Sequence, residues 1–321
     1  MDIPRYSELM ERTDAPPGSN WRLFGANDEL GTVNFATAEL VRAACGLVRR
    51  GATFGLDFPL DAFEPPMSPT RKPPEHVIFG RHADQRDDYL DGFYLQASSH
   101  IDGLRHRRHS SFGFYNGVAD DEVDVGTPQL GINRWAESGI VGRGVLVDVD
   151  RHLARAGRTL AHERGESFGP DLIDAAADAQ ELTLAPGDML LLRTGWTGWF
   201  FAQRDAGAIP PGKQPPSSGV EQSRAMLEWM WDHRLALVAA DNMAFEALPV
   251  SPSSPFHSET DGGLMHQEMI ALLGLAIGEL WNLDALAADC ADDGIYEFML
   301  VCKPLHLTGG VGSPANAIAL K

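Results

Sequence analysis

The sequence predicts an α/β protein, and two observations favour that class. Short apolar runs bounded by Gly, Asp or Pro, which are typical of buried strands, occur four times along the chain. Segments that favour helices alternate with these runs, and such alternation is typical of α/β folds. The predicted strands are Gly144–Val149, Asp188–Thr194, Leu235–Ala240 and Tyr296–Cys302, and the predicted helices are Thr37–Arg50, Pro170–Gln180, Gly219–His233 and Leu283–Asp292.

Capping residues support the helix starts. Thr37 is a candidate N-cap for the first helix, and Ser217 and Ser218 are candidate N-caps for the third. Glu221 would add an acidic residue to the first turn of that third helix. A further helix is expected from Leu264 to about Leu275.

Proline-rich stretches separate these elements and are predicted to be loops. None is long enough to be a domain linker, so we predict a single domain over residues 1–321. The stretches are 63–74, 209–218 and 249–255.

Composition excludes several classes of function. The formal net charge of −19 repels phosphate backbones and anionic membranes, so we expect neither nucleic acid nor membrane as a partner. No apolar run approaches the roughly 18 to 20 residues that span a bilayer. The three cysteines are too few for a disulfide framework, and we expect all three to be buried in a reducing compartment. The predicted location is therefore cytoplasmic.

Common catalytic and nucleotide-binding motifs are missing from the sequence. It contains no Gly-x-Ser-x-Gly elbow, no Walker loop and no His-Glu-x-x-His. These absences argue against serine hydrolases and nucleotide-binding proteins.

A polar stretch from Gln96 to His106 carries the strongest functional signal. If residues near 94–102 are extended, the side chains at 96, 98, 100 and 102 share one face. That face would present an amide, a hydroxyl, an imidazole and a carboxylate, a set suited to a divalent cation. Gly103 would then let the chain turn and bring His106 back towards the same site. The alternative is a polar edge strand followed by a basic, solvated loop.

Two residues far along the chain complete the pattern. His266 lies in an otherwise apolar predicted helix, and Glu279 follows in the apolar segment 276–283. A buried carboxylate in such a context needs a partner. Each residue alone could equally be an ordinary core or surface residue, and only the combination favours a metal site.

Together these residues resemble the cyclase family, which includes bacterial kynurenine formamidase, isatin hydrolase and dienelactone-hydrolase-like enzymes. The family motif is His-x-Gly-Thr-His-x-Asp-x-Pro-x-His, followed much later by a His and a Glu. The second motif His, the Asp and the last His fall on His100, Asp102 and His106, and the distal pair falls on His266 and Glu279. This sequence departs from the motif at four positions, which are Gln96 for the first His, Ser98 for Gly, Ser99 for Thr and Leu104 for Pro.

Further matches extend the resemblance over nearly the whole chain and suggest the longer branch of the family. They include Asn27–Asn34, Tyr115–Gly117, Gly139–Leu146, Ala240–Asn242 and Gly309–Pro314.

The resemblance implies a swivelling β/β/α fold that assembles as a homodimer or homotetramer. It also implies one or two divalent ions, Zn or Mn, held by His100, Asp102, His266 and Glu279. A metal-bound hydroxide would attack an amide, lactam, lactone or ester of a small aromatic or cyclic substrate, as in an arylformamidase. His106 would transfer the proton, and Gln96 would be a ligand or a donor to the developing oxyanion. The alternatives are a metal-dependent cyclase or dehydratase, and a binding protein that lost catalysis through Gln96.

Two other features stay open at this level. The aromatic run Trp196–Phe201 could line a pocket for a flat substrate or pack under a loop. Asp241 and Glu246 follow a predicted strand; Asp241 could orient a metal ligand or cap a turn.

Overall fold

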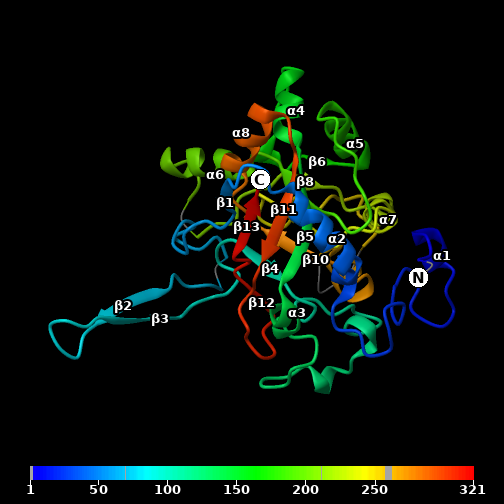
Figure 1. Cartoon of the computed structure of the whole chain (residues 1–321), viewed down its shortest axis with the longest axis horizontal. Coiled ribbons are helices and arrows are strands. Elements are labelled where there is room, and N and C mark those ends of the chain that lie inside the picture. Colours follow the sequence, from blue (N-terminus) through cyan, green and yellow to red (C-terminus); the bar gives the residue numbers. More distant parts are fainter. Residues whose placement is uncertain (1–2, 69, 211, 257–261) are drawn as a thin grey trace.

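A mixed β-sheet forms the centre of the protein, with helices packed around it (Figure 1). The computed structural model describes residues 3–68, 70–210, 212–256 and 262–321. Within these ranges the central sheet has nine strands. In the order in which they lie side by side they are β1 (Thr53–Gly55), β13 (Ala317–Leu320), β11 (Glu297–Cys302), β5 (Ile140–Asp148), β7 (Met189–Arg193), β9 (Leu237–Ala240), β10 (Ala276–Glu279), β4 (His100–Asp102) and β12 (Gly312–Ser313).

The middle of the sheet is parallel, and its edges are antiparallel. β5, β7, β9 and β10 run parallel to one another, whereas β11 and β4 flank them in the opposite direction. Parallel strands are buried on both faces, which explains why β7 and β9 are continuous apolar runs. The four predicted strands are therefore confirmed as β5, β7, β9 and β11, and the α/β class is confirmed with them.

The α-helices are α1 (Tyr6–Met10), α2 (Ala38–Ala44), α3 (Asn133–Ser138), α4 (Val149–Arg155), α5 (Pro170–Ala179), α6 (Trp196–Asp205), α7 (Arg224–Asp232) and α8 (Asp284–Asp293). α5 and α8 lie close to their predicted bounds. The predicted N-cap of α2 is confirmed, because the Thr37 hydroxyl accepts a hydrogen bond from the Leu40 amide at 3.4 Å. This helix is shorter than predicted and continues as a 3₁₀ turn over Cys45–Leu47.

The predicted start of α7 was wrong. Gly219–Val220 forms a short strand, β8, that pairs with β6 (Ser167–Phe168). Ser217 and Ser218 do not cap the helix, because both precede β8, and Glu221 also lies before the first helical turn. The backbone amide of Ser217 instead donates to the carbonyl oxygen of Leu248 at 2.8 Å. The true N-cap is Ser223, whose hydroxyl accepts from the Met226 amide at 3.0 Å.

The predicted helix from Leu264 to Leu275 is also shorter in the structure. A π-helix covers Gln267–Leu272, and His266 is its N-cap residue. The chain then turns through Gly274, which has a positive φ of 59°, and enters β10 at Ala276. A positive φ costs glycine little, so this residue permits the abrupt change from helix to strand.

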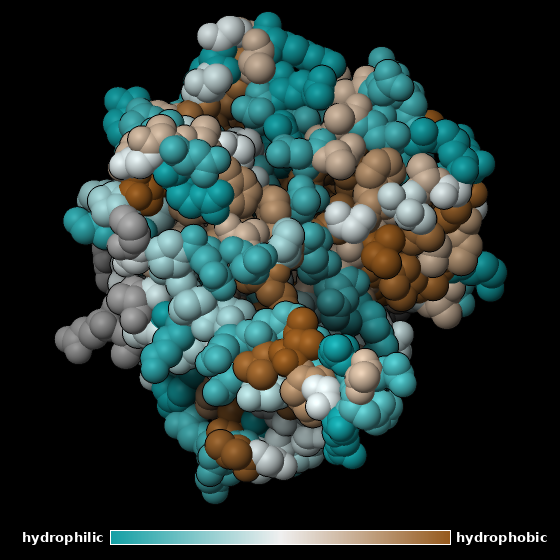
Figure 2. Space-filling view, turned by 90° about the vertical axis from the view of Figure 1, so that its left-hand side faces the viewer, coloured by the Kyte–Doolittle hydropathy of each residue, from teal (hydrophilic) through white to brown (hydrophobic). Residues whose placement is uncertain are grey.

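A hairpin that we call the arm projects from the body and was not predicted (Figure 1). Its strands, β2 (Glu75–Phe79) and β3 (Asp87–Asp91), pair only with each other among the described residues. Every side chain in the two strands except Val77 is exposed, including Ile78, Phe79 and Tyr89. Figure 2 views the side from which the arm projects, where apolar surface forms separate patches among hydrophilic side chains.

Two of the composition-based expectations can be compared with the structure. Cys45 is exposed, so the expectation that all three cysteines are buried was wrong; Cys290 and Cys302 are buried. None of the helices in the described ranges has the length and apolar character that a membrane crossing requires.

Candidate metal centre

The site is built on the pairing of β4 with β10. His100 lies opposite Glu279 in this antiparallel ladder, and Asp102 lies opposite Ile277. Opposed residues place their side chains on the same face of the sheet, so His100, Asp102 and Glu279 converge. His100 Nε2 lies 3.2 Å from Glu279 Oε2 and 3.7 Å from Asp102 Oδ1. One potential ligand atom from each of the three residues lies within 4.8 Å of the others.

His266 reaches the same point from the start of the π-helix. Its Nε2 atom lies 3.1 Å from Glu279 Oε1, and its Nδ1 atom lies 2.5 Å from Glu246 Oε1. The backbone amide of Met265 donates to both oxygens of Glu246, at 3.0 and 2.8 Å, and so fixes that carboxylate. We call His100, Asp102, His266 and Glu279 the cage; each is at most 7% exposed.

His106 and Gln96 border the cage on the Asp102 side. A turn returns His106 to the site, with its backbone amide donating to the Gly103 carbonyl at 2.9 Å. His106 Nε2 then lies 3.5 Å from Asp102 Oδ2. The Gln96 amide nitrogen lies 3.0 Å from His106 Nδ1 and also contacts Asp102. In this orientation Gln96 presents hydrogen-bond donors, rather than its carbonyl oxygen, to Asp102.

Both cage histidines are held in a way that suits metal ligation. His100 Nδ1 lies 2.8 Å from the Ser98 carbonyl oxygen, to which only a protonated nitrogen can donate. In the neutral ring Nε2 then carries a lone pair, and that lone pair faces carboxylate oxygens of Asp102 and Glu279. His266 repeats the arrangement, with Nδ1 on Glu246 and Nε2 facing Glu279. Lone pairs directed at carboxylates repel unless positive charge lies between them, which fits a metal cation.

The pKa values agree with a demand for positive charge at this point. Burial lowers the pKa of His266, but its contacts with Glu246 and Glu279 outweigh burial and leave the pKa well above its usual value. Burial raises the pKa of Glu279, yet contacts with His100 and His266 bring it below its usual range. The cage thus favours cationic charge, which protons or a metal ion can supply.

His106 has a different environment. Burial is the largest influence and lowers its pKa, the charge of Asp102 opposes this effect, and the charge of Arg107 adds to it. A lowered pKa favours the neutral imidazole, which can accept a proton.

A cavity of about 220 Å³ opens over the cage. Its wall combines the polar residues above with an apolar group and two arginines. The apolar side chains include Met67, Met243, Leu248, Leu264 and Leu280, and the arginines are Arg71 and Arg107.

The structure therefore brings together the six predicted site residues: Gln96, His100, Asp102, His106, His266 and Glu279. The expectation that an extended strand over residues 94–102 aligns their side chains was wrong. Only His100–Asp102 is a strand, not the whole of 94–102. Ser98 does not face the cage, because its hydroxyl donates to the Pro59 carbonyl at 3.0 Å. Gln96 instead reaches Asp102 from a turn. Trp196 belongs to helix α6 and packs against Phe200. Neither ring lines the cavity, although their apolar cluster includes Met67 and Leu280, which do.

Sequence reasoning named Glu246 but gave it no role. Its carboxylate is fully buried against His266 Nδ1. The signal available was a carboxylate in the otherwise apolar run 243–250, which demands a buried partner.

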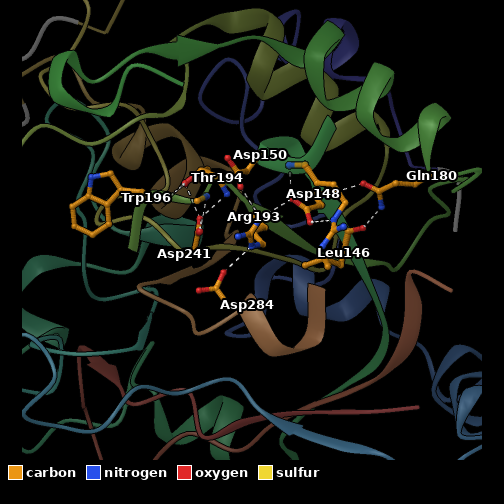
Figure 3. Close-up of polar contacts among 11 residues, drawn as sticks. Leu146, Asp148, Asp150, Gln180, Arg193, Thr194, Trp196, Asp241 and Asp284 are labelled. Carbon is orange, nitrogen blue, oxygen red and sulfur yellow. Dashed lines mark hydrogen bonds and ion pairs between the residues drawn. The ribbon is translucent and has the colours of Figure 1, made fainter. Parts of the chain in front are cut away.

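A second polar group, which we call the arginine cluster and which consists of Arg193, Asp148, Asp150 and Asp284, lies where β5 and β7 end (Figure 3). Arg193 Nη1 lies 3.0 Å from Asp148 and 2.9 Å from Asp150, and Arg193 Nε lies 2.8 Å from Asp284. Beside it, Asp241 accepts hydrogen bonds from the backbone amide and hydroxyl of Thr194, both at 2.7 Å, and from the Gly195 amide at 2.8 Å. Asp241 thus caps a turn and does not touch the cage.

Fold and site together define an α/β protein with a buried histidine–carboxylate cage on its central sheet. The family model described as "Putative cyclase" matches residues 58–247. A crystal structure described as a novel cyclase is 34% identical, covers 94% of this chain and 99% of that chain, and has a TM-score of 0.79. The chain belongs to the cyclase family, and the predicted fold type is confirmed with it.

More distant solved structures share the fold. Isatin hydrolase A from Labrenzia aggregata, bound to benzyl benzoate, is 17% identical, with a TM-score of 0.54 over 88% of this chain and 97% of that chain. An isatin hydrolase bound to the product analogue thioisatinate is 15% identical, with a TM-score of 0.53 over 89% of this chain and 99% of that chain. The comparison with curated proteins gives no match.

Proposed function

We propose that this protein is a metal-dependent hydrolase that cleaves an amide, lactam, lactone or ester of a small aromatic or cyclic substrate. One observation carries the proposal: His100 and His266 both direct Nε2 at Glu279 while their Nδ1 atoms are held from outside the cage. Membership of the cyclase family supports the reaction class, as do structural neighbours that are isatin hydrolases.

His100, Asp102, His266 and Glu279 would hold Zn or Mn, since two imidazoles and two carboxylates suit either ion. When bound, such an ion lowers the pKa of a coordinated water from about 16 towards roughly 7 and polarises a carbonyl. The cavity above the cage gives a small substrate access to this point.

The remaining polar residues have defined tasks in this proposal. His106 stays neutral near neutral pH because its pKa is lowered, so it can accept a proton and pass it to the leaving group. Gln96 donates to His106 Nδ1, which holds the ring with its Nε2 atom towards Asp102. The same amide is suitably placed to donate to an oxyanion that develops in the cavity.

Metal analysis tests the proposal directly. We expect one to two Zn or Mn ions per chain, loss of hydrolysis of formanilide or an activated aryl ester after chelation, and recovery when metal is restored. His100→Ala should lose the metal and the activity, whereas His76→Ala, a histidine exposed on the arm, should keep both. Full activity in metal-free protein would exclude this mechanism.

We also propose a homodimer or homotetramer. The exposed Ile78, Phe79, Tyr89 and Leu90 of the arm support assembly, because an isolated two-stranded hairpin is only marginally stable in water. Light scattering on the purified chain would measure the mass, and a monomer at micromolar concentration would contradict the proposal.

A further inference from the structure

The cavity wall carries more positive charge than the rest of this acidic chain would suggest. The whole sequence has 45 acidic and 26 basic residues, yet two arginines, Arg71 and Arg107, line this one small cavity. Its only acidic lining residues, within the described part of the chain, are Asp102 and Glu279 of the cage.

Arg71 is the better placed of the two to bind a ligand. It is half-buried, and its Nη1 atom donates to the backbone oxygen of Gln96, whose side chain contacts Asp102 and His106. Among the described residues this is the one hydrogen bond of its guanidinium, and no carboxylate lies within ion-pair distance of that group. A guanidinium has five N–H donors in a planar fork, so most of its donors remain available at the cavity wall.

Charge balance indicates what these donors bind. A divalent cation in the cage would neutralise Asp102 and Glu279, and the guanidinium of Arg71 would then stand at the cavity without a carboxylate partner among the described residues. Guanidinium groups match planar carboxylates in shape and bind them with two parallel hydrogen bonds. The cavity lining also includes apolar side chains, among them Met67, Met243 and Leu264.

We propose that the substrate carries a carboxylate beside an apolar ring, and that Arg71 binds this carboxylate. This inference rests on the proposed hydrolase function and specifies its substrate class. Because Arg71 is joined to the cage through Gln96, the carboxylate would lie close to the carbonyl that is cleaved.

Binding measured without turnover gives the first test. Isothermal titration of metal-loaded protein with benzoate and with the neutral isostere benzamide should show tighter binding of benzoate. Arg71→Gln should weaken benzoate roughly 10- to 100-fold and leave benzamide unchanged, as expected for losing a charge-assisted hydrogen-bond pair. Lys72→Gln, which removes the adjacent exposed charge outside the cavity wall, should change neither. Benzoate affinity that is unaffected in Arg71→Gln would mean that the cation alone binds the carboxylate, and would overturn the inference.

Turnover separates this inference from the proposed function. The probes are 2-formamidobenzoate and formanilide, which differ only in the carboxylate. Wild type should prefer the carboxylate probe in kcat/KM, and Arg71→Gln should lower kcat/KM for 2-formamidobenzoate more than for formanilide, so that the preference disappears. Hydrolysis of both probes with no preference overturns the carboxylate and keeps the hydrolase. Arg71-dependent benzoate binding with no hydrolysis of either probe supports the carboxylate and counts against the hydrolase.

Arg71→Lys, which keeps the charge but not the planar fork of the guanidinium, covers the case in which Arg71→Gln does not fold. This variant should lose part of the benzoate affinity.

Discussion

The cage and the arginine cluster both gather carboxylates near the central sheet, yet their partners differ. In the arginine cluster the protein supplies the countercharge, because Arg193 contacts the buried Asp148 and the more exposed Asp150 and Asp284 (Figure 3). In the cage the carboxylates face imidazole nitrogens whose other ring nitrogen is already engaged. A buried carboxylate therefore does not by itself indicate a metal site; the arrangement of the imidazoles around the carboxylates distinguishes the cage.

Asp241, beside the arginine cluster, is held by contacts within the protein. Burial raises the pKa of Asp241 to about 6, although hydrogen bonds from Thr194 and Gly195 and the charge of Arg193 oppose the rise. Its three hydrogen bonds are all made within the protein. No external ion is required there.

Among the substitutions that test the catalytic role of the cage region, the largest loss of turnover rate is expected at His106. His106→Ala should reduce the turnover rate roughly 10²- to 10⁴-fold, the usual contribution of a positioned acid or base. Metal content and fold should stay unchanged, because the four cage residues remain. Loss of metal from this variant would make His106 a ligand, and an unchanged rate would show that it takes no part in proton transfer.

Gln96 should have the next largest effect. Because its amide nitrogen contacts Asp102 and His106, we expect Gln96→Ala to keep the metal and to slow turnover by about 10²- to 10³-fold, as for other oxyanion donors. Weaker metal binding, measured by titrating the stripped protein, would instead identify the amide as a ligand. Gln96→His should tighten zinc binding if the shorter imidazole reaches the ion. No change in either variant would place Gln96 outside the site and cast doubt on the motif alignment.

Glu246 should have a smaller effect because it acts through His266. Glu246→Gln keeps the shape but removes the charge that orients and polarises the ring, so metal affinity or rate should fall roughly 10- to 100-fold. Competition with a chelator measures the affinity, and Glu228→Gln on the exposed face of α7 is the control. Equal affinity and rate in both variants would show that Glu246 only fills space.

Arg193 should have no effect on the metal and a clear effect on stability. Arg193→Met leaves the buried Asp148 with Arg151, whose Nε atom lies 3.3 Å from its Oδ2 atom, as its remaining arginine. The variant should lower the free energy of unfolding by about 1–3 kcal/mol, less than for a fully buried pair because Arg151 remains and 18% of the Arg193 side chain is exposed. Denaturant unfolding measures this change. Reduced metal content in the folded variant would show that the arginine cluster also contributes to metal binding, which contradicts the proposed difference between it and the cage.

The sequence predicts the centre of the fold better than its edges. β7 and β9 were predictable because strands buried on both faces must be continuously apolar. The start of α7 was not, since Ser217 and Ser223 are both good N-cap residues and only the pairing of Ser217 with Leu248 decides between them. The arm was not predicted because its strands bury almost no side chains and therefore do not alternate between apolar and polar residues.

The site was predictable in its residues but not in its geometry. Resemblance to the family motif indicated His100, Asp102 and His106, but a continuous strand from 94 would have placed Ser98 among them. Local turns place Gln96 beside Asp102 instead. Contacts such as that of Glu246 with His266 join residues 20 positions apart and leave no periodic trace in the sequence.

Residues on both sides of the arm line the cavity: Pro66, Met67, Ser68 and Arg71 before it, and Gln96 and Ala97 after it. Three of the four cage residues, by contrast, lie on β4 and β10 inside the sheet. A change in the length of the arm would therefore act on the cavity lining and on Gln96 before it reached the cage. The surface ribbon thus gives this fold a place where substrate preference can change while the metal ligands stay fixed.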